Sequence, residues 1–135
     1  MVSLPNETIF INSPEDLLRV RQAVRAWAVK LGFNLVDQAK IITAASELTR
    51  NVLEHGGGSG TVRLETLMND TRRGLRLTFE DKGPGIPDIA LAMKRGYTTK
   101  NGLGLGLSGA KRLVNDFMIE SRVGEGTRVT ITRWV

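Results

Sequence analysis

The sequence contains no cysteine and only one histidine, His55. Without cysteine the chain can form neither a disulfide framework nor a thiolate metal site, and a single histidine cannot build a histidine cluster for zinc. No apolar stretch reaches the length of a membrane span, and the N-terminus lacks the basic flank and apolar run of a secretory signal. We therefore expect a cytoplasmic protein with no membrane partner.

Aromatic residues are also few, with two Trp, one Tyr and four Phe among 135 residues. The net charge of +5 is compatible with binding to nucleic acid, to an acidic protein or to a polyanionic nucleotide. The basic residues are spread from Arg19 to Arg133 without a long run, and few aromatic side chains are available to stack on bases. This pattern is typical of a solvated surface, so we expect no nucleic-acid partner.

The length fits one compact domain, residues 1–135, in which helices precede and interrupt a run of strands. Apolar residues at helical spacing predict a helix that begins at the Ser13-Pro14-Glu15-Asp16 cap and ends at Gly32, and a second helix that is capped by Asp37 and ends near Glu54. The other elements expected from such patterns are strands at 7–12, 61–67, 75–80, 117–123 and 127–134, and helices at 88–95 and 108–115, the last one capped by Ser108. Together they predict an α/β fold, a two-layer sandwich of a mixed, mainly antiparallel sheet covered on one face by helices.

Three polar residues, Glu47, Asn51 and His55, recur at intervals of four on the second expected helix and therefore project from one face. An amide oxygen is a hard ligand suited to Mg²⁺, and a carboxylate one turn away can accept a proton from a nucleophile. The stripe fits a magnesium-nucleotide site, although the same three residue types also occur on ordinary solvent-exposed helix faces.

An acidic residue, Asp81, ends an expected strand and is followed by the turn sequence Lys82-Gly83-Pro84-Gly85-Ile86-Pro87. Two glycines and two prolines fix a turn whose backbone can approach a ligand closely. An ionised Asp81 only accepts hydrogen bonds, so it can bind the exocyclic amine of adenine and reject guanine at the same position. The alternative is that Asp81 simply ends the strand in a type II turn.

Glycines alternate in the segment Gly102-Leu103-Gly104-Leu105-Gly106-Leu107-Ser108-Gly109, which opens the last expected helix. Successive N–H groups of such a loop can face a phosphate, and the helix N-terminus adds partial positive charge. It is not a Walker loop, because Gly-Lys occurs nowhere in the chain. The loop ends the Gly- and Pro-rich stretch 81–106. Within this stretch we expect residues 88–101 to form a lid that is mobile without nucleotide and becomes less mobile when nucleotide binds.

The order of these three motifs, followed by Gly124-Glu125-Gly126-Thr127 before the last strand, resembles the N, G1, G2 and G3 boxes of the GHKL ATPases, the family of gyrase, Hsp90, histidine kinases and MutL. The stretch from Asp37 to Asn51 and the segments 83–88 and 109–113 are similar to the anti-sigma and stressosome switch serine kinases of the RsbT type. The resemblance runs over nearly the whole chain and implies a histidine-kinase-like α/β sandwich.

By this resemblance ATP and Mg²⁺ are the cofactors, Asn51 holds Mg²⁺, and Glu47 is the catalytic base. The resemblance also implies a nucleotide-binding role for Asp81 at adenine, for Gly83 and Gly85 around the adenine pocket, for Gly102, Gly104 and Gly106 at the phosphates, and for Thr127 at the adenine end.

Kinases of this type phosphorylate STAS-domain proteins of a stressosome-like complex and then bind and activate a PP2C-type phosphatase. The resemblance therefore implies an ATP-dependent serine/threonine protein kinase in a bacterial stress-response pathway. An alternative of another class is a non-catalytic adaptor, an anti-sigma or phosphatase-activating module that uses ATP only to set its shape.

Overall fold

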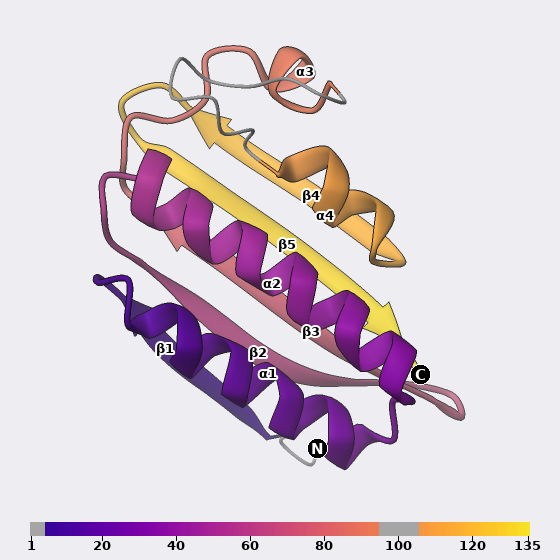
Figure 1. The fold of residues 1–135 in the computed structure, drawn as a ribbon. Coiled ribbons are helices and arrows are strands. Elements are labelled where there is room, and N and C mark those ends of the chain that lie inside the picture. Colours follow the sequence, from indigo (N-terminus) through magenta and orange to yellow (C-terminus); the bar gives the residue numbers. More distant parts are fainter. Residues whose placement is uncertain (1–4, 95–105) are drawn as a thin grey trace.

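The structure is a computed structural model that describes residues 5–94 and 106–135. After the first strand, pairs of helices alternate with pairs of strands along the described chain, and the two long helices come before most of the strands (Figure 1). In chain order the elements are β1 (Asn6–Ile11), α1 (Asp16–Leu31), α2 (Leu35–His55), β2 (Gly60–Asn69), β3 (Arg72–Asp81), α3 (Ile89–Ala92), α4 (Leu107–Arg112), β4 (Asp116–Arg122) and β5 (Gly126–Trp134).

The five strands form one sheet in the order β1-β2-β3-β5-β4. Helices α1 and α2 lie side by side on one face of this sheet, with α4 next to α2 (Figure 1). The predicted two-layer sandwich is therefore confirmed. The expectation of a mixed sheet is wrong for the described strands, because all four neighbouring pairs are antiparallel. Two of these pairs, β2–β3 and β4–β5, join strands that follow each other directly in the chain, where a short turn imposes antiparallel pairing.

The core lies between the helices and the inward face of the sheet. Apolar residues at helical spacing on α2 face alternate residues of the central strands, as the sequence patterns predicted. Its largest fully buried side chains include Val20 and Val24 of α1, Ile41 and Leu48 of α2, Val62 and Leu64 of β2, Leu75 and Leu77 of β3, and Ile131 of β5.

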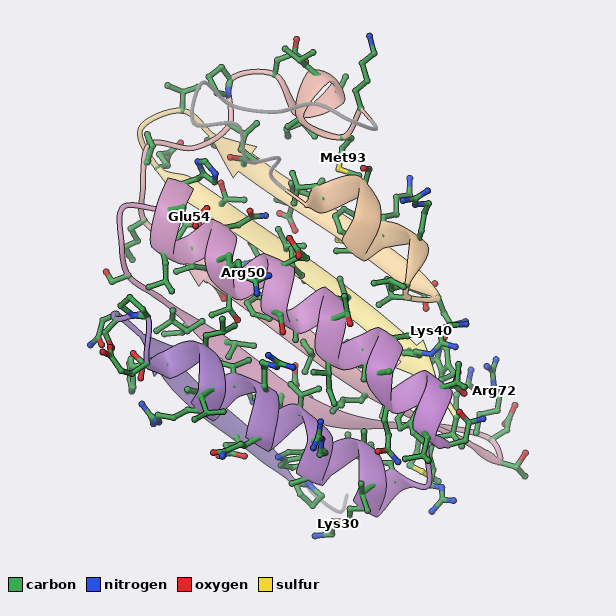
Figure 2. All side chains as sticks on the ribbon, in the orientation of Figure 1. Lys30, Lys40, Arg50, Glu54, Arg72 and Met93 are labelled. Carbon is green, nitrogen blue, oxygen red and sulfur yellow. The ribbon has the colours of Figure 1, made fainter. Side chains whose placement is uncertain are left out.

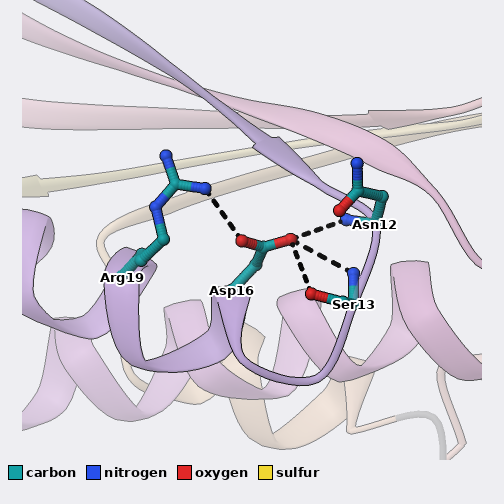
Figure 3. Close-up of polar contacts among 4 residues, drawn as sticks. All are labelled: Asn12, Ser13, Asp16 and Arg19. Carbon is teal, nitrogen blue, oxygen red and sulfur yellow. Dashed lines mark hydrogen bonds and ion pairs between the residues drawn. The ribbon is translucent and has the colours of Figure 1, made fainter.

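The start of α1 depends on Asp16 rather than on the predicted Ser13 cap (Figure 3). The Ser13 hydroxyl accepts no hydrogen bond from the helix and instead donates to Asp16 Oδ2 at 3.3 Å. The same oxygen accepts the backbone N–H groups of Asn12 and Ser13 at 2.9 and 3.1 Å, and Asp16 Oδ1 pairs with Arg19 Nη1 at 2.8 Å. A buried carboxylate therefore satisfies the donors of the chain that enters the helix.

The N-cap of α2 is Asn34, three residues before the predicted Asp37. Asn34 Oδ1 accepts the N–H of Asp37 at 2.8 Å, which is the usual capping bond to the third helical residue. The Asp37 carboxylate is free for another role, and it pairs with Arg133 Nη2 at 2.6 Å. The helix therefore begins a turn earlier than predicted, and Asp37 lies inside it and makes a long-range ion pair that local patterns do not reveal.

The later elements differ from the predictions mainly at their ends. Helix α4 is shorter than expected and begins after Gly106, which adopts a left-handed conformation with φ 69°, so Ser108 is a residue of the first turn and not the N-cap. The short predicted helix at 88–95 is present as α3, capped by Asp88. The β2–β3 hairpin turns within two residues, 70 and 71, because both strands extend further than their apolar alternation indicates.

Candidate functional site

A cavity of about 390 Å³ lies between the C-terminal half of α2, the ends of β3 and β5, and the segment 84–92. This volume is within the usual range for a site that binds a small molecule. Most of its lining is apolar, and the few polar side chains converge from separate elements. The lining consists of Leu48, Asn51, Val52, His55, Phe79, Asp81, Pro84, Gly85, Ile86, Pro87, Asp88, Leu91, Ala92, Leu107, Thr127 and Val129.

Two members of the polar stripe on α2, Asn51 and His55, line this cavity. The third, Glu47, lies one turn earlier and outside the lining, against the start of α4. A Cβ placed on Gly106 would be 2.5 Å from Glu47 Oε2, so the backbone at Gly106 passes close to the carboxylate. Arg50 projects from α2 (Figure 2), and its Nη1 is 3.0 Å from Glu47 Oε1.

His55 carries a polar atom without a hydrogen-bond partner. Its Nε2 is buried, and no described residue of the protein bonds to it, the nearest carboxylate oxygen being Glu54 Oε2 at 3.9 Å. Unpaired buried polar atoms are rare in folded proteins. The sequence placed His55 on the stripe without a role, and the structure brings it to the cavity.

Asp81 reaches the same cavity from the end of β3. Its Oδ1 accepts the N–H of Gly83 at 3.0 Å, which leaves further acceptor capacity on the carboxylate. Burial raises the pKa of Asp81, and the backbone N–H groups of Gly83 and Thr127 act in the opposite direction. A partly desolvated acceptor at a cavity wall is the arrangement that binds an amine donor strongly.

The turn after Asp81 passes very close to neighbouring backbone. Gly85 lines the cavity with φ 77°, and a Cβ there would overlap the carbonyl of Arg122. Gly83 is outside the lining and packs against Gly56 at the end of α2. Both glycines therefore place the turn beside the cavity, and Gly85 alone contributes to its wall.

Thr127 lines the cavity from the start of β5 and is the register partner of Asp81. Its hydroxyl is 2.8 Å from the hydroxyl of Ser121, a residue that the sequence motifs did not single out. The alternating pattern of β4 could have indicated Ser121, because this polar residue occupies an inward position after the apolar Phe117 and Ile119.

The predicted phosphate loop is described only in part. Gly106 caps α4 beside Glu47, whereas Gly102 and Gly104 lie outside the described residues. The predicted lid, 88–101, is described up to residue 94, and its first residues line the cavity.

Within residues 5–94 and 106–135, no three His, Cys, Asp or Glu side chains are grouped closely enough to hold a metal ion. The amide oxygen of Asn51, at the wall of the cavity, is a hard ligand of the kind that Mg²⁺ accepts. None of the helices in the same described ranges is long and apolar enough to cross a membrane.

Comparisons with known proteins agree with this geometry. The sequence profile described as "Histidine kinase-, DNA gyrase B-, and HSP90-like ATPase" matches residues 36–134. Serine/threonine-protein kinase RsbT of Bacillus subtilis (strain 168) is 44% identical over 120 residues, which span 89% of this chain and 90% of RsbT. An anti-sigma F factor of Geobacillus kaustophilus (strain HTA426) is 30% identical over 121 residues, or 85% of this chain and 82% of that protein.

Solved structures show the same fold. The crystal structure of the RsbU and RsbW domains of a Mycobacterium tuberculosis protein superposes with a TM-score of 0.68 and 25% identity, covering 96% of this chain and 32% of that one. The catalytic domain of histidine kinase ThkA superposes with a TM-score of 0.55 and 18% identity, covering 94% of this chain and 95% of that one. The chain therefore belongs to the histidine kinase-, DNA gyrase B- and HSP90-like ATPase family, as an RsbT-like member with anti-sigma factors among its relatives.

Proposed function

We propose that this protein is an ATP-dependent serine/threonine protein kinase that phosphorylates STAS-domain proteins in a bacterial stress-response pathway. The observation that carries the proposal is the convergence of Asn51, His55, Asp81 and Thr127 on one cavity, with Glu47 one turn away beside the start of α4. The similarity to the B. subtilis serine/threonine-protein kinase RsbT supports the reaction class.

Asp81 and Thr127 are the residues proposed to bind the adenine base. The cavity walls around them are apolar, which suits a flat ring, and the ionised Asp81 accepts the hydrogens of the exocyclic amine. Gly85 and Gly83 keep the adjacent turn close enough to form this wall.

The phosphate end of the site is proposed to be formed by α2 and the glycine loop. Asn51 offers an amide oxygen to Mg²⁺, and His55 lies one helical turn further along the same wall of the cavity. The glycines Gly102, Gly104 and Gly106 are proposed to present backbone N–H groups to the phosphates. When bound, Mg-ATP supplies the transferable phosphoryl group and the metal charge that stabilises its transfer.

Glu47 is proposed to be the general base. Its carboxylate lies one helical turn from Asn51 and is about one-third exposed, so that it can face both the nucleotide and a docked protein. It would accept the proton of the attacking serine or threonine hydroxyl, which is a weak nucleophile while protonated. Arg50 holds one carboxylate oxygen and thereby orients the side chain.

The partners are proposed to be STAS-domain proteins of a stressosome-like complex and a PP2C-type phosphatase. The test is to incubate the purified protein with labelled Mg-ATP and a panel of STAS-domain proteins, and to measure the label that each protein acquires. Transfer to serine or threonine of at least one STAS protein is expected. ATP binding without transfer to any of them would instead identify a non-catalytic adaptor.

A further inference from the structure

Ser121 is a polar residue at a position where the strand pattern calls for an apolar one. Phe117 and Ile119 of β4 point toward the helices and pack against the core, and Ser121 follows them on the same face of the sheet. It is half-buried, so that its hydroxyl needs partners within the protein.

The Ser121 hydroxyl has three partners, and they belong to two separate walls of the cavity. Its Oγ accepts the backbone N–H of Ile86 at 2.8 Å, from the turn that follows Asp81. It also lies 3.1 Å from the carbonyl oxygen of Gly126 and 2.8 Å from Thr127 Oγ1, both at the start of β5. Because Ile86 and Thr127 line the cavity, one hydroxyl outside the lining connects two of its walls.

Counting hydrogens assigns a direction to each of these bonds. Ser121 has one hydrogen to donate and can accept two, the N–H of Ile86 only donates, and the carbonyl of Gly126 only accepts. All three contacts are hydrogen bonds at once only if Ser121 donates to Gly126 and Thr127 donates to Ser121. The Thr127 hydrogen then points away from the cavity, and only the lone pairs of its oxygen face inward.

This direction makes Thr127 an acceptor beside another acceptor. Thr127 and Asp81 are register partners on adjacent strands, and both line the cavity. A ligand edge with two N–H hydrogens, such as the exocyclic amine of adenine, matches this pair, whereas the carbonyl oxygen that guanine carries at the same position does not.

We propose that Ser121 is a positioning residue for nucleotide selection, which joins the 83–87 turn to the β4–β5 hairpin and fixes the Thr127 hydroxyl as an acceptor for an adenine amine. The inference rests on the proposed function, because it concerns the base of the bound nucleotide. Ser121 acts through Thr127 and Ile86 and touches no reacting atom.

The test compares binding of Mg-ATP and Mg-GTP to the full chain and its variants by calorimetry. Ser121→Ala frees the Thr127 hydroxyl to donate into the cavity, so we expect roughly tenfold weaker ATP binding and a similar fall in the preference for ATP over GTP, as for loss of one hydrogen bond in a buried site. At saturating ATP, kcat should stay within about twofold of the wild type, since Glu47 and Asn51 are on another element and uniform binding affects only KM. Thr130→Ala removes a hydroxyl from the opposite face of β5 and should change neither value.

A second variant tests the direction of the bond even if Ser121→Ala does not fold. Thr127→Val keeps Ser121 but removes the hydroxyl that is proposed to accept the adenine amine. This variant should show the same fall in the preference for ATP over GTP as Ser121→Ala. In the double variant the two losses should not add, because both changes remove one network. The inference is overturned if the wild type binds ATP while Ser121→Ala or Thr127→Val keeps the full ATP preference. A wild-type chain that binds no ATP overturns the proposed function as well.

Discussion

The ionised form of Asp81 that is proposed to bind adenine destabilises the folded chain when no nucleotide is bound. Burial raises its pKa, so the ionised carboxylate that a nucleotide amine requires is less favourable in the folded protein than in the unfolded one. For an acid whose pKa is raised on folding, stability falls as pH increases through the folded pKa. The unliganded protein therefore loses stability at neutral pH by keeping a carboxylate at this position.

The Asp81→Asn variant separates the two effects. The amide places an N–H where an acceptor is required, and we expect ATP binding to weaken by about 1–3 kcal/mol. Without nucleotide, the variant should melt at the same temperature as the wild type or higher, because no buried charge remains. Glu80→Gln, at an exposed neighbouring position, is the matched control and should change neither property. Unchanged ATP affinity in Asp81→Asn would remove Asp81 from the site.

Glu47 and Asn51 lie one turn apart, and their variants should fail in different ways. Glu47→Gln keeps the size of the side chain but loses the base, so we expect nearly normal Mg-ATP binding and at least about a hundredfold slower transfer to a protein substrate. Asn51→Ala should instead weaken Mg-ATP binding itself, because it removes a metal ligand. Glu54→Gln on the same helix is a control for loss of charge. Transfer at the wild-type rate by Glu47→Gln would show that alignment alone provides catalysis.

Residues that line the cavity themselves were easier to predict from the sequence than residues that only position them. Asn51, Asp81 and Thr127 belong to recognisable sequence motifs, and the structure brings all three to one cavity. Ser121 and Ile86 are 35 residues apart, and their bond becomes visible only when β4 pairs with β5 beside the 83–87 turn. Spacing along one chain segment contains no information about such a contact.

At the scale of single elements, the entry into α1 depends on one ionised side chain. The pKa of Asp16 is lowered from its ordinary value of 3.8, chiefly by the N–H of Asn12 and next by Arg19. For an acid with a lowered folded pKa, the stabilisation is complete above the unfolded pKa and is lost as pH falls through the folded one. Figure 3 shows how one carboxylate connects both sides of this turn.

We therefore expect Asp16→Asn to lower the melting temperature most at neutral pH. The difference from the wild type should shrink below about pH 4, where the wild-type carboxylate also becomes protonated. Asp70→Asn, at an exposed hairpin position with φ 54° that Asn tolerates, is the control and should melt like the wild type at every pH. Melting curves by circular dichroism from pH 7 to pH 2 provide the measurement. A difference that stays constant over this range would contradict the role of the charge.

Element boundaries were less predictable than the elements themselves. Both Asn34 and Asp37 are good capping residues; Asn34 is the cap, and the carboxylate of Asp37 instead binds Arg133, which is 96 residues away. The α4 boundary depends on the left-handed conformation of Gly106, which allows the backbone to pass Glu47. Local propensity gave the helices and strands, whereas tertiary contacts decide where each one begins.

At the scale of the whole molecule, the cavity is built from several elements of the core rather than from one segment. Its lining comes from α2, β3, β5, α4 and the segment 84–92, and β3 is a central strand of the sheet. Unfolding of any of these elements would destroy the site. A ligand in the cavity is therefore linked to the global stability of the domain rather than to one loop.

Because binding and global stability are linked, the melting temperature of the intact chain reports on the site. A ligand that binds only the folded state stabilises it by about 2.7 kcal/mol when its concentration is a hundred times Kd. For a domain of this size such a gain corresponds to a rise in melting temperature of roughly 10 °C. We expect Mg-ATP to produce this rise in the wild type, and a smaller rise when a chelator removes Mg²⁺, because Asn51 then has no metal to share with the phosphates.

Asp81→Asn should lose most of the rise at the same ATP concentration, while Glu47→Gln should retain it, because the base contributes to transfer and not to binding. An equal rise in all three proteins would place ATP outside this cavity, and no rise in the wild type would contradict nucleotide binding altogether.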